Sequence, residues 1–193
     1  MTTLADLKPL QPPSTTPGGK RILDAASQLF YHRGVAATGL DLVVERAGVT
    51  KRTLYQRFGS KDGLIRAYLA TRAFRWQSLV MDRVQQATDD GSDPLAGVFD
   101  LTHEWVTDNP RGCGFVNAWA ELGDSCSAET QSTIRQEKEW MQALFVLLTG
   151  EDETGKLVHE LYEGGLVCAA IMNDLEAISR AKAGALQLAK AVT

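Results

Sequence analysis

The sequence has few cysteines and no long apolar run. Its 193 residues include three cysteines, Cys113, Cys126 and Cys168, and no pair of them is spaced as CxxC. This pattern argues against a disulfide framework and against a zinc site, so we expect no metal and no cofactor. No apolar stretch approaches the roughly 18 to 20 residues of a membrane-spanning helix, and the first residues lack a basic region followed by an apolar one. We therefore expect a soluble, cytoplasmic protein without a membrane partner.

The signatures of common enzymes are also missing. The stretches HEWVT (103–107) and HELYE (159–163) lack the second His of HExxH, and GCGFVN (112–117) lacks the third Gly of a dinucleotide-binding loop. No GxSxG motif is present. We expect no catalytic residues, and an enzyme is the alternative class of function that the sequence supports least.

Period-two alternation is scarce, which leaves little room for strands. Four of the six prolines lie in residues 1–17, and this composition cannot bury a core, so we expect a disordered arm there. From Lys20 onward, apolar residues recur every three or four positions between turn-forming stretches. The sequence predicts an all-α fold with helices at about 20–33, 40–47, 51–58, 60–88, 94–108, 112–123, 127–149 and 156–192, the last breaking near 178–179.

Charge is distributed unevenly along the chain. The formal net charge is −4, yet residues 18–62 contain eight basic and four acidic side chains, a net charge of +4. Residues 63–193 contain eleven basic and nineteen acidic side chains, a net charge of −8. A basic segment joined to an acidic remainder indicates that one end of the chain meets a polyanion, although an ordinary solvated surface is the alternative.

The basic segment contains the parts of a helix-turn-helix. One predicted helix ends at Gly48, a short turn follows, and Thr50 can cap a second helix at 51–58. In this motif the second helix enters the major groove of DNA, and its first residues reach the base edges. We expect Leu54 and Phe58 to turn inward and hold that helix in place. The side chains nearest the bases are then Arg52, Thr53 and Tyr55, and Lys51, Arg57 and Lys61 neutralise phosphates.

Residues 18–70 resemble the N-terminal DNA-binding domain of the tetracycline-repressor (TetR) family of bacterial regulators. The resemblance is carried by "RILDAASQLFYHRGVAATGLDLVVERAGVTKRTLYQRFGSKDGLIRAYL" as a whole. It implies that Thr38 and Lys61 bind phosphates and that Tyr55 touches the DNA backbone or a thymine methyl. It also implies a DNA-binding domain at 18–65 and a helical ligand-binding and dimerisation domain at 66–193. The candidate DNA-binding residues are Thr38, Thr50, Lys51, Arg52, Thr53, Tyr55, Gln56, Arg57 and Lys61.

Three positions depart from the family pattern. Gly39 stands where Thr or Ser is frequent, so the cap of the helix at 40–47 falls to Thr38 or is weaker. Val44 replaces a small residue where two helices cross. Gly63 replaces a common Glu or Ala, which removes a capping-box partner for Ser60. These departures concern geometry and leave the recognition helix as it is.

The second domain carries small-residue seams that suit packing between helices. Residues 157, 161, 164, 168, 172 and 175 repeat at spacings of three and four, and Ala181, Ala185, Leu188 and Val192 form a second seam. The resemblance implies that this domain dimerises, and residues 156–192 are the predicted homodimer interface. Packing within one chain is the alternative.

The segment "NPRGCGFVNAWAELGD" resembles a GC-x-F-x-N stretch that borders the ligand cavity in some of these regulators. The resemblance implies a cavity for an unknown effector, and the aromatic residues of this domain suggest an apolar or aromatic one. Ordinary core packing is the alternative for each aromatic residue. The thiol of Cys113, at a helix start and near Arg111, also allows a redox or electrophile sensor. The candidate ligand-binding residues are Trp105, Cys113, Phe115, Asn117, Trp119 and Met172.

Together these observations predict a DNA-binding transcriptional regulator. We expect a homodimer that binds a palindromic double-stranded operator as a repressor and is released by a small-molecule effector. The alternatives are a constitutive DNA-binding protein without a ligand and a thiol-based redox sensor acting through Cys113.

Overall fold

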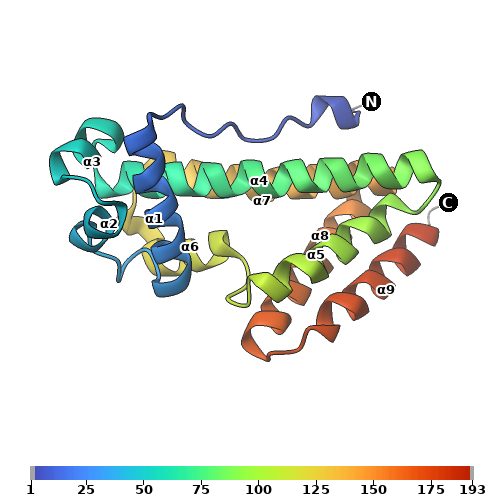
Figure 1. Ribbon diagram of the computed structural model, residues 1–193. Coiled ribbons are helices and arrows are strands. Elements are labelled where there is room, and N and C mark those ends of the chain that lie inside the picture. The colour runs from blue at the N-terminus through green and yellow to red at the C-terminus, as the bar shows by residue number, and fades with distance from the viewer. Residues whose placement is uncertain (1–2, 192–193) are drawn as a thin grey trace. The chain divides into compact units, whose positions relative to one another are not determined.

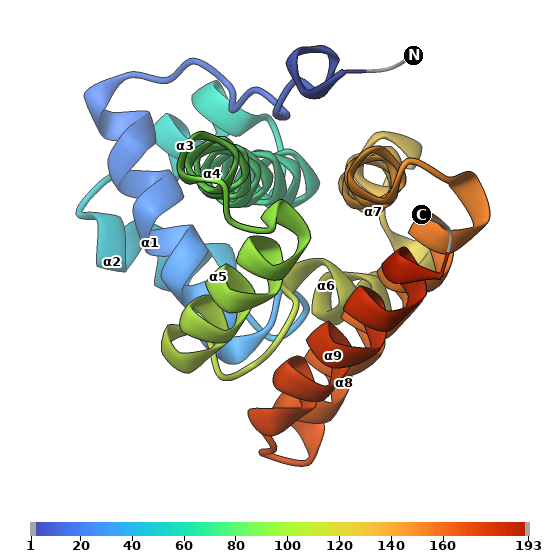
Figure 2. The ribbon, with the colours of Figure 1, turned by 90° about the vertical axis from the view of Figure 1, so that its right-hand side faces the viewer.

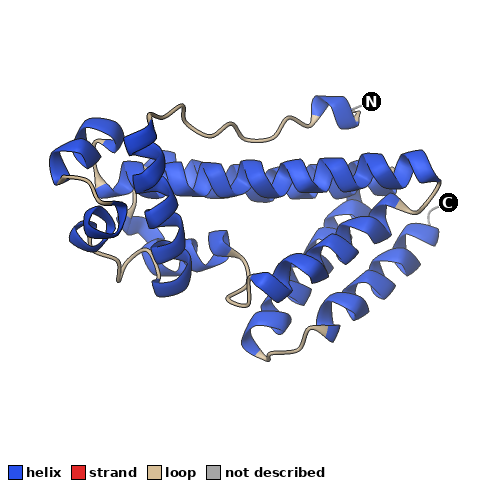
Figure 3. Cartoon of the chain, in the orientation of Figure 1, coloured by secondary structure: helices blue, strands red, loops and turns tan. Residues whose placement is uncertain are grey.

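The computed structural model describes residues 3–191, which form nine α-helices and two 3-10 turns and contain no strand in that range (Figure 3). The predicted all-α fold is confirmed. The elements are η1, Leu4–Asp6; α1, Pro17–Arg33; α2, Leu40–Ala47; α3, Lys51–Phe58; α4, Lys61–Asp90; α5, Pro94–Asp108; α6, Gly114–Leu122; η2, Gly123–Ser125; α7, Ala128–Thr149; α8, Asp152–Ile171; and α9, Glu176–Lys190 (Figure 1).

The chain divides into two compact units. We call residues 10–75 and 114–137 the head unit, and residues 1–9, 76–113 and 138–193 the body unit. These units differ from the predicted domains at 18–65 and 66–193, because α4 continues unbroken through residue 65 and α6 packs within the head unit.

The core of the head unit comes from the inner faces of α1, α2, α3 and α4. Ile22, Val43, Leu54 and Leu64 are fully buried, and Phe30 meets Tyr68 edge-on with ring centroids 5.6 Å apart. These are the apolar positions whose three- and four-residue spacing predicted the helices. Burying them fixes α3 against α1 and α2, so the opposite face of α3 turns to solvent.

Aromatic residues fill the core of the body unit. Phe99, Phe145 and Tyr162 form a cluster with centroid separations between 5.3 and 5.9 Å, and Trp76 packs on Trp105 at 5.3 Å. Phe99 and Phe145 are almost fully buried. For these side chains, core packing accounts for the aromatic content of the sequence.

The bounds predicted for the last helix, residues 156–192, are wrong. It begins at Asp152 rather than 156, because the Glu151 side chain caps it by accepting hydrogen bonds from the backbone N–H groups of Glu153 and Thr154. It breaks at 172–175 rather than at 178–179, where Asn173 adopts a positive φ of 52°. The resulting helices α8 and α9 lie side by side (Figure 2).

The arm follows an extended course before α1. Its first part contains η1 and Leu7, which is buried in the core of the body unit. Near its end, Thr16 caps α1 by accepting a hydrogen bond from Gly19 N–H at 3.3 Å. That residues 1–17 are disordered in solution stays a prediction, and residues 1–2 lie outside the described residues.

Candidate nucleic-acid interface

A tight turn joins α2 to α3. Gly48 ends α2 in the left-handed conformation with φ 62°, which a glycine adopts without a steric penalty. The hydroxyl of Thr50 then accepts a hydrogen bond from Thr53 N–H at 3.2 Å and caps α3. Both features follow the sequence prediction and give α3 a fixed direction relative to α2.

The outer face of α3 is uncovered. Leu54 is fully buried, whereas the next residue, Tyr55, is 49% exposed. Arg52, Gln56 and Arg57 are exposed as well, and Arg52 forms no ion pair within the described part of the chain. A short helix that presents two arginines, an amide and a phenol to solvent has the donors that base edges and phosphates require.

Lys51 has a partner inside the head unit. Its ammonium lies 2.6 Å from the Asp41 carboxylate of α2, and this hydrogen bond raises the pKa of Lys51. Both side chains are largely exposed, so water weakens the pair. The Lys51 ammonium can therefore bind a phosphate only if it breaks its contact with Asp41 or contacts both groups at once.

Thr38 does not face a possible DNA partner. Its side chain is fully buried, and its hydroxyl donates to the Gly34 carbonyl at 2.6 Å. The prediction of a phosphate contact at Thr38 is corrected, because a buried hydroxyl already bound to a backbone carbonyl cannot reach a phosphate. Thr38 does not cap α2 either. Gly39 occupies the cap position and makes no side-chain hydrogen bond, so the weaker cap expected from the sequence is the one present.

Lys61 and Glu121 hold the turn between α1 and α2 from two sides. Lys61 Nζ donates to the Ala36 carbonyl at 3.1 Å, and Ala36 N–H donates to the Glu121 carboxylate at 2.9 Å. Partial burial lowers the pKa of Lys61, while Glu121 acts in the opposite direction. Gly34 has a φ of 94°, and a Cβ there would lie 2.6 Å from a Glu121 oxygen. Sequence reasoning missed Glu121, since its partner is 85 residues away.

Asp62 ties the start of α4 to the start of α7. Its carboxylate accepts hydrogen bonds from Ser127 Oγ at 2.6 Å and Thr130 Oγ1 at 3.0 Å. Partial burial raises the pKa of Asp62, but the hydrogen bonds from Ser127 and Thr130 outweigh it, and the net pKa lies below its ordinary value. This anchor fixes α4 directly after α3, and no local sequence signal could have predicted it.

The six candidate ligand-binding residues are not gathered in one cavity of a single unit. Trp105, Cys113 and Met172 belong to the body unit, and Phe115, Asn117 and Trp119 to the head unit. Trp105 packs on the core, Phe115 is buried, and Trp119 and Met172 are 46% and 68% exposed. The cavities described below are lined by other residues. That these six bind an effector stays a prediction.

Cys113 does have a chemically significant neighbour in the body unit. Lys138 Nζ lies 3.2 Å from its sulfur and donates to both oxygens of Glu163 at 2.8 and 3.0 Å. Burial raises the pKa of Glu163, but His159 and Lys138 favour the carboxylate more strongly, and the net pKa is lowered. Of the other cysteines, Cys126 Sγ donates to a backbone carbonyl, and Cys168 lines a groove on the α8 surface together with Arg180.

The described residues contain neither a membrane-spanning helix nor a cluster of metal ligands. Within residues 3–191, no helix is both long and apolar enough to cross a membrane. The same residues contain no group of three His, Cys, Asp or Glu side chains placed to hold a metal ion.

Known proteins resemble the chain in sequence and in fold. Residues 22–68 match the model of the bacterial regulatory proteins of the tetR family. The chain is 41% identical over 69 residues to the transcriptional activator FasR of Mycolicibacterium smegmatis, covering 36% of this chain and 32% of FasR. It is 30% identical over 115 residues to the transcriptional repressor ComR of Escherichia coli, covering 58% and 54%. The aligned segments thus span less than two thirds of either relative.

A solved TetR-family transcriptional regulator from Streptomyces coelicolor matches over most of its length. The identity is 26%, the TM-score is 0.70, and the match covers 91% of this chain and 95% of that one. The helix-turn-helix, the family model and this structural match agree, and the chain belongs to the TetR family of transcriptional regulators.

Proposed function

We propose that the chain binds a palindromic operator as a homodimer and represses transcription until an effector releases it. The observation that carries the DNA-binding part is the uncovered cationic face of α3, fixed by a glycine turn on one side and Asp62 on the other. The relatives include an activator and a repressor. We favour repression because the alignment with the repressor extends further along this chain than the alignment with the activator.

The α8 surface supports the dimer. Leu161, Val167 and Ile171 are exposed, the last to 80%, and they continue a stripe that includes Leu157. Beside it lies an apolar groove of about 540 Å³, lined by both α8 and α9. Gly164 faces open space, so another helix could approach closely there. A twofold axis would cover this face with its own copy.

Helix α6 offers a route from effector to operator. It begins one residue after Cys113, and Glu121 near its end accepts the hydrogen bond from Ala36. An effector that displaces the start of α6 would pull on the turn held by Glu121 and reorient α3. A tenfold to hundredfold release needs a coupling free energy of only about 1.4 to 3 kcal/mol.

Selection of bound DNA from a random pool tests the proposal. We expect an enriched palindrome whose half-site centres lie about one helical turn, roughly 34 to 36 Å, apart. A single unrepeated half-site would contradict the dimer, and no enrichment would contradict operator binding. A small-molecule library screened by thermal shift then tests the effector, because a ligand at a hundred times Kd stabilises the native state by about 2.7 kcal/mol.

A thiol-based variant is the second candidate, and the 3.2 Å contact between Lys138 and Cys113 favours it. Reactive cysteines are typically found beside cationic side chains. Peroxide would then transfer one oxygen to the sulfur, giving a sulfenic acid and water, and the product would occupy more space just before α6.

Hydrogen peroxide titrations separate the two candidates. In the thiol variant, peroxide releases operator DNA from the wild type and from Cys168→Ser, but not from Cys113→Ser. Release that persists in Cys113→Ser, or no release at all, would contradict the thiol variant. A non-covalent effector found in the library should still act on Cys113→Ser.

A further inference from the structure

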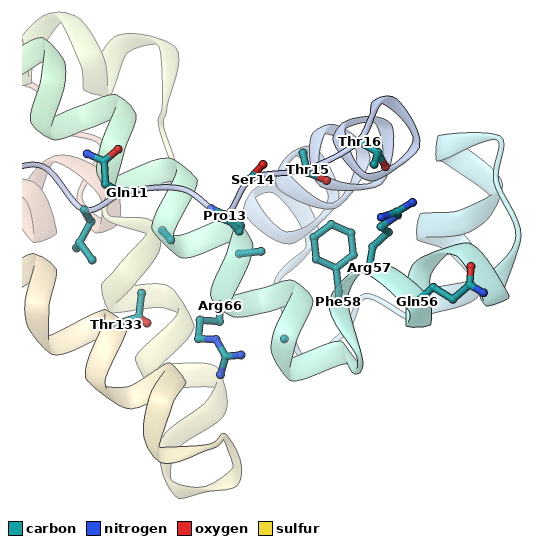
Figure 4. A pocket seen from close by; sticks show the side chains of 14 residues that line it. Gln11, Pro13, Ser14, Thr15, Thr16, Gln56, Arg57, Phe58, Arg66 and Thr133 are labelled. Atoms are coloured by element: carbon teal, nitrogen blue, oxygen red, sulfur yellow. The ribbon is translucent and has the colours of Figure 1, made fainter.

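The head unit contains a cavity next to the recognition helix, and none of the residues expected to bind an effector lines it. Its volume is about 630 Å³, and Figure 4 shows it between the arm, the end of α3 and the first turns of α4. The arm contributes residues 10, 11 and 13–16, and α3 contributes Gln56, Arg57 and Phe58. All fourteen residues that line it belong to the head unit.

The charge of this cavity has one sign. Arg57 and Arg66 line it, and the fourteen lining residues include no Asp or Glu. Neither arginine forms an ion pair within the described residues, and both are exposed. Figure 4 shows the two arginines on either side of Phe58, and the Asp62 and Glu129 carboxylates, which do not line the cavity, act electrostatically on Arg66. Guanidinium groups that form no ion pair can take an anionic group, because guanidinium pairs with carboxylate, sulfonate or phosphate oxygens.

The rest of the wall is partly apolar. In Figure 4 the Phe58 ring lies between the side chains of Arg57 and Arg66. Pro13, Ala67 and Ala70 add further apolar surface. A volume in the range of small-molecule sites is far larger than an inorganic anion needs. The matching ligand is therefore an organic anion with an apolar body, such as an aromatic or aliphatic acid.

Glycines lie at two close approaches in this region, that of α4 to the end of α3 and that of the arm to α1. A Cβ at Gly63 would lie 2.0 Å from the Phe58 carbonyl oxygen, so only glycine lets α4 start this close to the end of α3. A Cβ at Gly19 would lie 1.9 Å from Thr15 Oγ1, a side-chain atom that rotation of Thr15 could move away. The departure at Gly63 from the family pattern thus has a structural reason, and it positions Arg57 and Phe58 beside Arg66.

We propose that this cavity binds an amphipathic organic anion and that this ligand competes with DNA for Arg57. The anionic group would pair with Arg57 and Arg66 while the apolar body covers Phe58. Arg57, expected to neutralise a phosphate, cannot bind both anions fully. The competition is reciprocal: operator DNA must weaken the ligand by the same factor by which the ligand weakens DNA.

Binding of a fluorescent probe tests the site directly. The probe is 1-anilinonaphthalene-8-sulfonate, an aromatic body with one sulfonate, and its neutral analogue N-phenyl-1-naphthylamine is the matched control. We expect the sulfonate to bind more tightly than the analogue, and Arg66→Gln to weaken the sulfonate at least tenfold. Arg135→Gln, an exposed arginine of the same unit outside the cavity, should leave binding unchanged. Equal sulfonate affinity in folded Arg66→Gln and wild type would overturn the proposal.

The salt dependence of operator binding tests the competition. Losing one phosphate contact reduces the slope of log K against log salt by about 0.9. We expect saturating sulfonate to cause this reduction in the wild type but not in Arg57→Gln, which already lacks the contact. An unchanged slope in the wild type would overturn the competition. If Arg57→Gln without probe kept the wild-type slope, Arg57 would not contact a phosphate. That result would contradict the DNA contact in the proposed function and not the anion site. Melting curves establish that each variant is folded.

Discussion

The head unit and the body unit leave different kinds of side chain uncovered. On α3 the exposed residues are Lys51, Arg52, Tyr55, Gln56 and Arg57. The exposed residues of α8 include four large apolar ones, Leu157, Leu161, Val167 and Ile171, beside the acidic Asp152, Glu153 and Glu160. Both helices bury one apolar face, so the difference lies only in the outer face. Two helices built by the same packing rules therefore offer surfaces suited to partners of different chemistry.

The two surfaces should also respond oppositely to salt. Contacts between cations and phosphates weaken as salt rises, because counterions compete for the phosphates. Apolar contacts do not weaken in this way, and excluded salts such as sulfate strengthen them. A salt titration that follows both dimerisation and operator binding would thus separate the two surfaces in one protein.

The largest effect is expected from a charge placed on the apolar surface. Leu161→Glu should give a monomer in sedimentation, because a carboxylate would lose its hydration in the dimer interface. The monomer has one reading head, so we expect the palindromic operator to bind at least about 100-fold more weakly, about 2.7 kcal/mol. Leu79→Glu is the matched control, since Leu79 on α4 has the same 36% exposure. A dimeric Leu161→Glu protein would show that α8 is not the interface.

Two adjacent glycines of α8 distinguish its inner face from its outer face. A Cβ at Gly165 would lie 3.1 Å from the Ala181 side chain of α9, whereas one at Gly164 would meet nothing within 4 Å. Gly165→Leu should destabilise the protein by about 1 to 3 kcal/mol through overpacking. Gly164→Leu should leave thermal unfolding of the isolated chain near that of the wild type and weaken only the dimer. Chemical denaturation and sedimentation measure the two effects, and equal losses of folding stability would contradict the assignment of faces.

On the cationic surface, Arg52 and Lys61 should behave differently. Arg52 is exposed on the first turn of α3, so Arg52→Ala should cost about 1 to 3 kcal/mol and relax the preference at one position of each half-site. Lys61 is expected to neutralise a phosphate, so Lys61→Ala should weaken all sequences alike and flatten the salt slope. Competition binding against single-base variants of the operator measures both. Uniform weakening by Arg52→Ala would contradict its role in reading bases.

Local sequence patterns predicted the elements of the fold well. The spacing of Ile22, Leu29 and Phe30, the turn at Gly48 and the cap at Thr50 each act within a few residues, and the structure has the corresponding helices. The break after α8 was placed too late, because a small-residue seam continued past Asn173 and concealed it. Periodicity shows where helices can form, but the end of a helix depends on a few backbone angles.

Long-range polar contacts could not be predicted. Glu121 with Ala36, Asp62 with Ser127, and Lys138 with Cys113 join residues 25 to 85 positions apart. Nothing in the neighbourhood of either partner signals the other. Thr38 was misassigned for a related reason: its hydroxyl found a backbone carbonyl four residues away, a contact that depends on the shape of the turn.

The smallest predicted effect compares one buried carboxylate in each unit. The pKa of Asp62 in the head unit and that of Glu163 in the body unit are both below their ordinary values in the folded protein. Between the folded and unfolded pKa values, the unfolded state binds more protons. The stability from each group is therefore complete above its unfolded pKa, about 3.9 for Asp and 4.3 for Glu, and is lost as pH falls through the folded value.

Glu163→Gln and Asp62→Asn should each flatten the loss of stability below about pH 4, by less than about 1.4 kcal/mol, the equivalent of one pKa unit. Denaturant unfolding from pH 6 to pH 2.5 measures this, with Glu160→Gln, on the same helix but exposed, as the control. If the two units unfold in separate transitions, the prediction for Glu163 becomes more specific. Glu163→Gln should then change only the transition reported by the tryptophans of the body core, because Lys138 and His159, the side chains beside it, belong to that unit. A pH profile identical to that of the wild type in Glu163→Gln would show that His159 and Lys138 do not hold this carboxylate ionised.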